Sequence, residues 1–156
     1  MIPNIQILTQ EIAETTYPSR TYKILFNTSE LDENIPAVRV RGLSLTNTAA
    51  EYDRVSGYVD NIESVMQAIY LILSTERYKH IIYSWDYGVE LVDLFGKPIP
   101  YVIAEIPRRI KEALIQDDRI DDVVDFEFER QRNKLHVTFT VITNIGNITA
   151  EVGVNV

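Results

Sequence analysis

Residues 124–154 read VDFEFERQRNKLHVTFTVITNIGNITAEVGV. Apolar and polar side chains alternate along three segments of this stretch, and side chains with a period of two point to opposite faces of a strand. A glycine-bearing turn at residues 144–147 separates the last two segments. The stretch therefore predicts a three-stranded antiparallel meander whose apolar face needs helices to cover it. Its apolar positions are Val124, Phe126 and Phe128, then Leu135, Val137, Phe139 and Val141, then Ile148, Ala150, Val152 and Val154.

A helix is predicted over residues 60–75. Asp60 is followed three residues later by Glu63, which is the spacing of a capping box at a helix start. Apolar residues then recur at the spacing of one helix face, and this stripe is interpreted as core rather than as a cofactor site. Its members are Ile62, Val65, Met66, Ile69, Tyr70 and Leu73.

A second helix is predicted over residues 103–114 from the spacing of Ile103, Ile106, Ile110, Ala113 and Leu114. Pro107 lies inside this pattern, where it removes one backbone donor and clashes with the preceding turn. Two alternatives follow: the helix kinks at this proline, or the proline lies near the helix start.

The segment between the two helices is less regular. Residues 80–85 are aromatic and β-branched, which predicts a short strand, and Asp86-Tyr87-Gly88 predicts a turn after it. Residues 89–95 are apolar but interrupted by acids, and their type stays open. A further turn is predicted at Gly96-Lys97-Pro98.

Residues 1–17 show no sustained period, and we expect an extended N-terminal arm there. Residues 22–26 and 38–43 alternate and are predicted to pair as two strands across a loop. Residues 44–56 are polar and irregular, which indicates a surface crossing. The whole pattern predicts an α+β fold in which residues 18–156 form a single domain, with two main helices packed on an antiparallel sheet that includes the C-terminal meander.

The composition excludes several classes of protein. The chain has 156 residues and a net charge of −8, from 15 Lys and Arg against 23 Asp and Glu. Such a charge repels phosphate backbones, so no nucleic-acid partner is expected. No apolar run approaches the roughly 18 residues of a membrane span, so no membrane partner is expected, and no signal peptide is recognisable. Without cysteine there is no disulfide framework and no thiolate nucleophile.

The sequence offers little material for catalysis. His80 and His136 are the two histidines, and their separation gives no convergent metal site. The six glycines are scattered, which excludes a nucleophile elbow and a phosphate loop as motifs. Glu76, Asp86 and Glu90 could be assembled into a carboxylate pair that cleaves a glycosidic bond, but no feature of the sequence marks one of them as buried in an apolar pocket. No cofactor and no metal are expected.

An acidic run, Asp117-Asp118-Arg119-Ile120-Asp121-Asp122, lies between the second helix and the meander. It is either a solvated turn or a charged docking patch. Because a helix C-terminus disfavours nearby anions, acids at this position indicate a cationic partner, either within the chain or outside it.

Residues 73–88, LSTERYKHIIYSWDYG, resemble a family of baseplate wedge or sheath-initiator proteins from contractile phage tails, PBSX-like prophage elements and R-type bacteriocins. The resemblance extends over about residues 22–154 and includes the second helix and the strands after Arg119. In the wider family an acid, a proline and an arginine follow the second helix. This chain has Asp117-Asp118-Arg119, which keeps the acid and the arginine but lacks the proline.

The resemblance implies a structural protein without catalysis. Its partners would be the sheath protein, the baseplate wedge proteins and the tail tube or hub, in about six copies per baseplate. It would be assembled in the bacterial cytoplasm into a phage or bacteriocin particle and would initiate the sheath by strand complementation. A peptidoglycan hydrolase is the alternative, and a tail assembly chaperone is a third possibility. The expected partner-binding residues are Glu76, Arg77, Asp86, Tyr87, Asp117 and Arg119, with Thr149, Glu151, Val152 and Val154 on the last strand.

Overall fold

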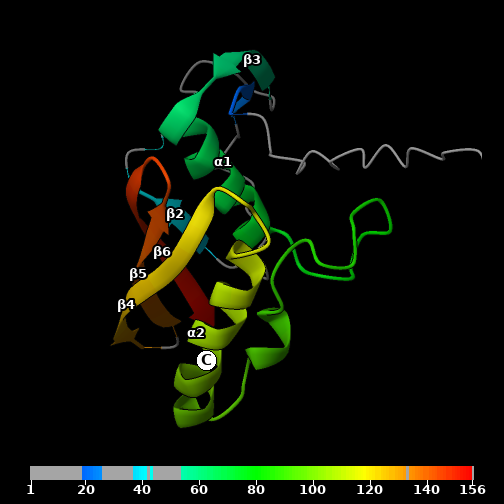
Figure 1. Ribbon diagram of the computed structural model, residues 1–156. Helices are drawn as coiled ribbons and strands as arrows, with labels where there is room; N and C mark the ends of the chain where they lie inside the picture. The colour runs from blue at the N-terminus through cyan, green and yellow to red at the C-terminus, as the bar shows by residue number, and fades with distance from the viewer. Residues whose placement is uncertain (1–18, 26–36, 42, 44–53, 133, 156) are drawn as a thin grey trace, which may run out of the picture.

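A computed structural model describes residues 19–25, 37–41, 43, 54–132 and 134–155. The fold is α+β, as predicted: two helices cover one face of an antiparallel sheet, and a separate two-stranded ribbon lies at one end (Figure 1). The expected arm at residues 1–17 lies outside the described residues. The elements in chain order are β1 Thr21–Leu25, β2 Ala37–Val40, β3 Arg54–Val59, α1 Asn61–Ser74, the 3-10 helix η2 Val92–Leu94, α2 Ile99–Leu114, β4 Ile120–Gln131, β5 Lys134–Thr143 and β6 Gly146–Asn155.

The predicted C-terminal meander is confirmed. Strands β4, β5 and β6 pair antiparallel in sequence order, and β5 pairs with β6 without interruption from Lys134↔Asn155 to Thr143↔Gly146. The alternating apolar residues of β5 and β6 form the floor of the core, and Phe139 is among the largest buried side chains. Strand β4 is less regular, because its pairing with β5 shifts twice and Asp125 has a φ of 56°.

Helix α1 begins where the capping signal predicted. The side chain of Asp60 accepts a hydrogen bond from the backbone N–H of Asn61 at 2.7 Å, and the helix ends at Ser74 with Thr75 as its C-cap. Val65, Ile69 and Leu73 of the predicted stripe are fully buried. The stripe is therefore core, as interpreted.

Helix α2 runs without a break from Ile99 to Leu114, so Pro107 lies in its interior rather than near its start. Pro100 occupies the first turn, where a missing N–H costs little. Ile106 and Ile110 flank the internal proline in sequence and are fully buried. We infer that their packing compensates for the roughly 3 kcal/mol that an internal proline costs a helix.

The predicted pairing of the first two strands is wrong. Strand β1 pairs with β3, and β2 pairs with β6 in the four-stranded sheet, whose order is β2-β6-β5-β4. Strand β3 also replaces the end of the expected surface crossing, whose residues 44–53 lie outside the described part of the chain. Alternation reveals which face of a strand is buried but not which strand is its neighbour.

A buried glutamine explains how β1 is held. Gln67 on α1 accepts a hydrogen bond from the N–H of Ile24 at 3.0 Å and donates one to the carbonyl of Tyr22 at 2.8 Å. The side chain thereby satisfies backbone groups of β1 in the way a neighbouring strand would.

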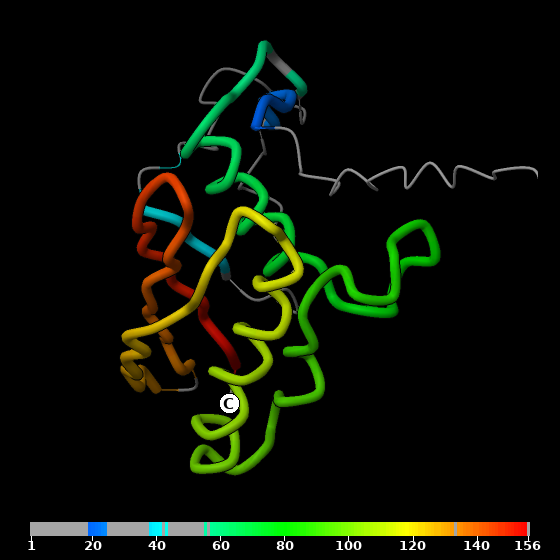
Figure 2. Tube along the Cα trace, in the orientation of Figure 1, coloured from blue at the N-terminus to red at the C-terminus, as the bar shows by residue number. Residues whose placement is uncertain are grey.

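The strand predicted over residues 80–85 is also wrong. Residues 77–88 form a projecting loop of successive turns, closed at its base by the bond from the N–H of Val89 to the carbonyl of Thr75 at 2.9 Å (Figure 2). We name this segment the 77–88 loop. The turn predicted at Asp86-Tyr87-Gly88 is present, with a φ of 95° at Gly88. After the loop, the chain returns to the core through Val89, Leu91 and Leu94, the last of which lies in η2.

Candidate functional site: a groove between the two helices

The helices and the returning limb of the 77–88 loop enclose a groove of about 310 Å³, which we call the interhelical groove. One wall comes from α1, the opposite wall comes from α2 and the residues after it, and Ser84, Asp86 and Tyr87 close one side. Four of the residues expected to bind partners meet there, although they come from two segments of the sequence. The lining residues are Ala68, Leu71, Ile72, Ser84, Asp86, Tyr87, Ala113, Gln116, Asp117 and Arg119.

A buried ion pair lies in the wall of this groove. The guanidinium of Arg119 binds Asp117 through two bonds, Nε to Oδ1 at 2.8 Å and Nη2 to Oδ2 at 2.6 Å, and Asp117 is only 6% exposed. The backbone N–H of Arg119 also donates to Asp117 Oδ1 at 3.1 Å. This bidentate geometry fixes the plane of the guanidinium, which a lysine could not do.

The acidic run therefore finds cations within the chain. Asp117 binds Arg119, and Asp122 lies 2.6 Å from Nζ of Lys111 near the end of α2. The Lys111 ammonium and the backbone N–H of Val123 hold the pKa of Asp122 below its usual range. Of the two alternatives for this acidic run, a cationic partner within the chain or outside it, the first is therefore present for Asp117 and Asp122.

Tyr87 supplies an aromatic wall that stays neutral. Its ring stacks on Tyr83 with 4.8 Å between centroids. Burial above all, together with the nearby Tyr83 and Asp117, raises the pKa of Tyr87 to about 12. The phenol is thus protonated at neutral pH and offers the groove an apolar face with one hydroxyl donor.

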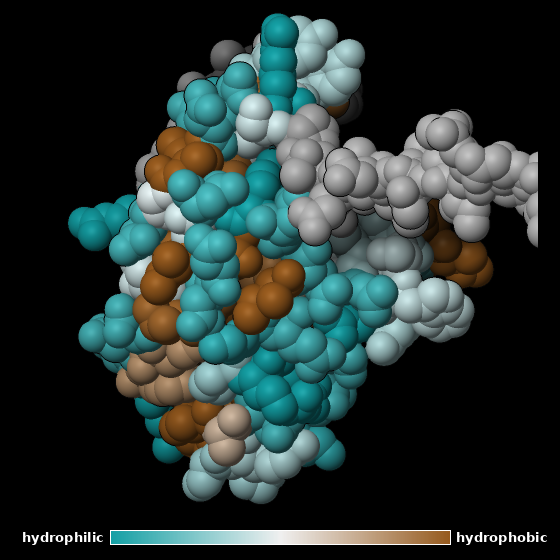
Figure 3. Space-filling view, viewed as in Figure 1, coloured by the Kyte–Doolittle hydropathy of each residue, from teal (hydrophilic) through white to brown (hydrophobic). Residues whose placement is uncertain are grey.

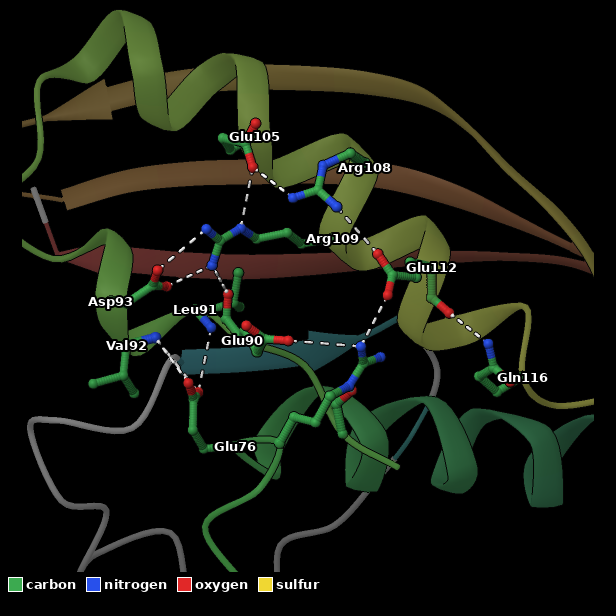
Figure 4. Close-up of polar contacts among 12 residues, drawn as sticks. Glu76, Glu90, Leu91, Val92, Asp93, Glu105, Arg108, Arg109, Glu112 and Gln116 are labelled. Atoms are coloured by element: carbon green, nitrogen blue, oxygen red, sulfur yellow. Dashed lines mark hydrogen bonds and ion pairs between the residues drawn. The ribbon is translucent and has the colours of Figure 1, made fainter. Parts of the chain in front are cut away.

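Arg77 fastens the loop to the second helix. Its side chain is only 8% exposed, and it donates to the carbonyl of Gly88 at 3.1 Å and to Glu112 at 3.0 Å. Glu112 in turn binds Arg108 at 3.2 Å (Figure 4). Sequence position gave no hint of this network, because its members are brought together only when α2 packs beside the loop.

Glu76 is engaged by backbone rather than by another side chain. Its carboxylate accepts hydrogen bonds from the N–H groups of Leu91 at 3.3 Å and Val92 at 3.4 Å, at the start of η2 (Figure 4). Burial raises the pKa of Glu76, and these two bonds act in the opposite direction. The described contacts give Glu76 a positioning role for the segment that follows the loop.

The acids considered for glycosidic cleavage do not line one common groove, although Glu90 lies near enough to Glu76 to contribute to its raised pKa. Asp86 lines the interhelical groove, whereas Glu90 lines a second groove of about 190 Å³ with Arg77, Arg108, Arg109 and Glu112. Glu76 lines neither of these two grooves. Across the described residues no group of three or more His, Asp or Glu side chains could hold a metal ion.

The four expected binding residues on β6 lie outside the groove lining. Val152 and Val154 are fully buried core residues, while Thr149 and Glu151 lie on the opposite face of the sheet, half-exposed. Both edges of β6 are already paired, with β5 and with β2 at Val38↔Val152, so strand complementation cannot take place at these four residues. Glu151 instead contacts His136, with 2.8 Å between Oε1 and Nδ1.

Six lining residues escaped the sequence-based prediction: Ala68, Leu71, Ile72, Ser84, Ala113 and Gln116. Ile72 and Ala113 carry the periodic signal of core positions, and nothing local distinguishes a groove wall from a core. One signal was available, namely the small side chain of Ala68 in an otherwise bulky helix face.

Among the described helices none is long and apolar enough to cross a membrane.

Comparison with known proteins identifies the family. Residues 41–146 match the family described as contractile injection system sheath initiator. The chain belongs to this family. The predicted resemblance is thereby confirmed, and a structural role in a contractile injection system follows from it.

Two relatives of this sheath initiator are similar to it over part of its length. It is 43% identical over 96 residues to the phage-like element PBSX protein XkdS of Bacillus subtilis (strain 168), an alignment that covers 60% of this chain and 68% of that protein. A chain of the cryo-EM structure of the anti-feeding prophage (AFP) baseplate, 6-fold symmetrised, is 26% identical, with a TM-score of 0.48 over 57% of this chain and 73% of that chain.

Proposed function

We propose that this sheath initiator joins the inner baseplate and starts the sheath, holding a wedge protein in the interhelical groove and presenting its four-stranded sheet to the first sheath ring. The observation that carries the proposal is the convergence of Asp86, Tyr87, Asp117 and Arg119 on one groove in a chain of this family. The tail tube or hub would contact another face, and six copies would form the ring.

The groove has the chemistry of a protein-binding site. Apolar side chains from both helices form most of its surface, and Asp86 offers an exposed carboxylate at the side. The Arg119 guanidinium is already held in place, so little side-chain entropy is lost when a partner binds. A partner segment with one apolar side chain and an adjacent cation fits these features.

The sheet offers a second contact surface at one of its edges. Among the described strands, β2 and β4 lie at the ends of the sheet. Two register shifts and the positive φ of Asp125 twist β4, and such irregularities disfavour the addition of a strand. Strand β2 is therefore the edge that we assign to strand complementation by a sheath subunit.

The orientation of β2 supports this assignment. The N–H of Arg41 bonds to the carbonyl of Thr149 on β6 at 2.9 Å. Because alternate residues of a strand point their N–H groups to opposite sides, those of Val38 and Val40 point away from β6. They are the donors that an added strand would use.

No catalysis is part of this proposal. Asp86 and Glu90 line different grooves, and Glu76 lines neither and is bonded to backbone N–H groups, which supports a structural role for these acids. The glycosidase alternative would need two carboxylates about 5 to 10 Å apart in one groove. Incubation with peptidoglycan tests it directly: release of sugar fragments that Glu76→Gln abolishes would contradict the proposal.

Two matched substitutions test the groove. Ala68→Phe fills it from the α1 wall, and Ala104→Phe adds the same side chain at an exposed position of α2. We expect the first variant to be missing from purified baseplates and the second to be incorporated normally, with both folded by circular dichroism. Equal incorporation of both variants would overturn the role of the groove.

Two substitutions test the edge of β2. Val38→Pro removes an outward-pointing donor, which an edge strand tolerates, while Val38→Ala keeps the donor and removes a comparable part of the side chain. Purified variants are mixed with the sheath protein of the same gene cluster and scored by sedimentation and electron microscopy. We expect Val38→Ala to nucleate ordered sheath and Val38→Pro to fail; nucleation by both would exclude strand addition at β2.

A further inference from the structure

The 77–88 loop carries the three most exposed large hydrophobic side chains among the described residues. Ile81 is 101% exposed, Ile82 is 86% exposed and Trp85 is 80% exposed, and we call these three residues the apolar knob. The loop stands away from the helices in Figure 2, and hydrophobic side chains are visible at the same edge of the molecule in Figure 3. A projecting apolar tip of this kind is uncommon on a protein surface that has no partner.

The base of the loop is held firmly. Arg77 binds the carbonyl of Gly88 and the carboxylate of Glu112, so both limbs are tied to α2. At Gly88 an added Cβ would lie 2.6 Å from the carbonyl oxygen of Thr75, which shows how closely the two limbs approach. The loop is therefore a fixed projection.

Aromatic contacts support the tip from below. Tyr78 packs against Trp85 with 5.8 Å between centroids, and Tyr83 stacks on Tyr87 at the groove. His80 meets the edge of Tyr83 at 6.1 Å. These side chains hold the tip in one shape, and a preorganised binding element loses little entropy when it docks.

We infer that the apolar knob inserts into an apolar pocket on a neighbouring protein subunit of the baseplate, with an acidic side chain of that subunit at the rim facing Lys79. This inference rests on the proposed function and adds a third contact to the groove and the β2 edge. A narrow convex tip fits a concave pocket, as anchor residues of protein interfaces do. Lys79 is exposed, and no acid occurs between Arg77 and Trp85, so the tip carries a positive charge on a chain of net charge −8.

Charge also favours a protein pocket over a lipid surface. The chain carries a net charge of −8, which anionic headgroups repel. The single lysine of the tip is too little positive charge to offset this repulsion. A membrane contact is thus the competing outcome, and the test below includes it.

Trp85 is the one tryptophan of the chain and reports directly on the knob. Labelling this chain alone with 5-hydroxytryptophan allows its emission to be followed inside assembled baseplates. We expect emission at shorter wavelength and protection from acrylamide in the baseplate, and no change with vesicles of phosphatidylglycerol and phosphatidylcholine. A fully quenchable Trp85 in the baseplate, or a shift with vesicles, would overturn the inference.

A pair of double variants provides the matched control. Ile81→Ser with Ile82→Ser removes the apolar tip, whereas Ile81→Leu with Ile82→Leu keeps it. Loss of two buried aliphatic groups weakens binding by about tenfold or more, so baseplate occupancy should fall for the serine variant and recover for the leucine variant. Both should melt like the parent chain. Equal occupancy of the two variants would contradict the insertion of the apolar knob and leave the proposed function untouched. Absence of the parent chain from baseplates would contradict the proposed function itself.

Discussion

The ion pair of Asp117 and Arg119 lies in the wall of the interhelical groove. Because Asp117 is buried, removal of its partner leaves a charge without compensation. We expect Arg119→Ala to lower the free energy of unfolding by about 3–5 kcal/mol, the usual range for a broken buried pair.

Chemical denaturation measures this loss, and the double variant Asp117→Ala with Arg119→Ala is the control. The double variant should lose less stability than the sum of the two single variants, because it leaves neither charge alone. Additive losses would show that the two side chains do not act as a pair.

Tyr87 makes the stability of the chain depend on alkaline pH. Its phenol ionises near pH 10 in the unfolded chain, and burial raises its pKa to about 12 in the folded chain. Its contribution is therefore complete below pH 10 and is lost as the pH rises from 10 to 12. The melting temperature of Tyr87→Phe should fall less across this interval than that of the parent chain; parallel curves would contradict the burial of the hydroxyl.

Among the elements, the 77–88 loop depends on one glycine. Gly88 has a φ of 95°, and a side chain there would meet the backbone of Thr75. We expect Gly88→Ala to cost about 1–3 kcal/mol of stability and to loosen the loop. Gly96→Ala is the matched control, because Gly96 also has a positive φ of 72° but faces open space.

Thermal melting and hydrogen exchange measure both glycine variants. Gly88→Ala should accelerate exchange at Val89, whose N–H closes the base of the loop. Gly96→Ala should leave that amide protected. Similar losses of stability in the two variants would show that the positive φ alone requires glycine at position 88, and that the short distance to the carbonyl oxygen of Thr75 adds nothing.

For the molecule as a whole, Phe139 tests whether the helices and the sheet share one core. It is buried at the centre of β5 and stacks on Phe126 at 5.3 Å. Phe139→Ala should cost about 3–5 kcal/mol, which is a large part of the stability of a typical domain. Tyr101→Ala on the exposed surface of α2 should change it by no more than about 0.5 kcal/mol.

Urea unfolding followed separately by circular dichroism and fluorescence measures this effect. The two signals should change together for the parent chain and for Phe139→Ala, because one core unfolds as one unit. Separate transitions for the helices and the sheet would contradict the expectation that residues 18–156 form a single domain.

Strong local patterns account for what was predictable here. The meander and both helices follow from side-chain periodicity, and the start of α1 follows from capping chemistry at Asp60; each of these acts over a few residues. The family resemblance also selected Asp86, Tyr87, Asp117 and Arg119, and the fold places all four around one groove. That they bind a partner stays a prediction.

Other features depend on segments that are distant in the sequence. Alternation could not reveal that β1 pairs with β3 or that β2 covers β6, since every strand offers the same backbone donors and acceptors. The aromatic residues 80–85 have strand-like composition, yet the closure at Thr75 and Val89 turns them into a loop. The interhelical groove exists only where two helices and this loop meet. Periodicity along the chain therefore determines which side chains are buried, whereas pairing, closure and hollows depend on how distant surfaces fit together in space.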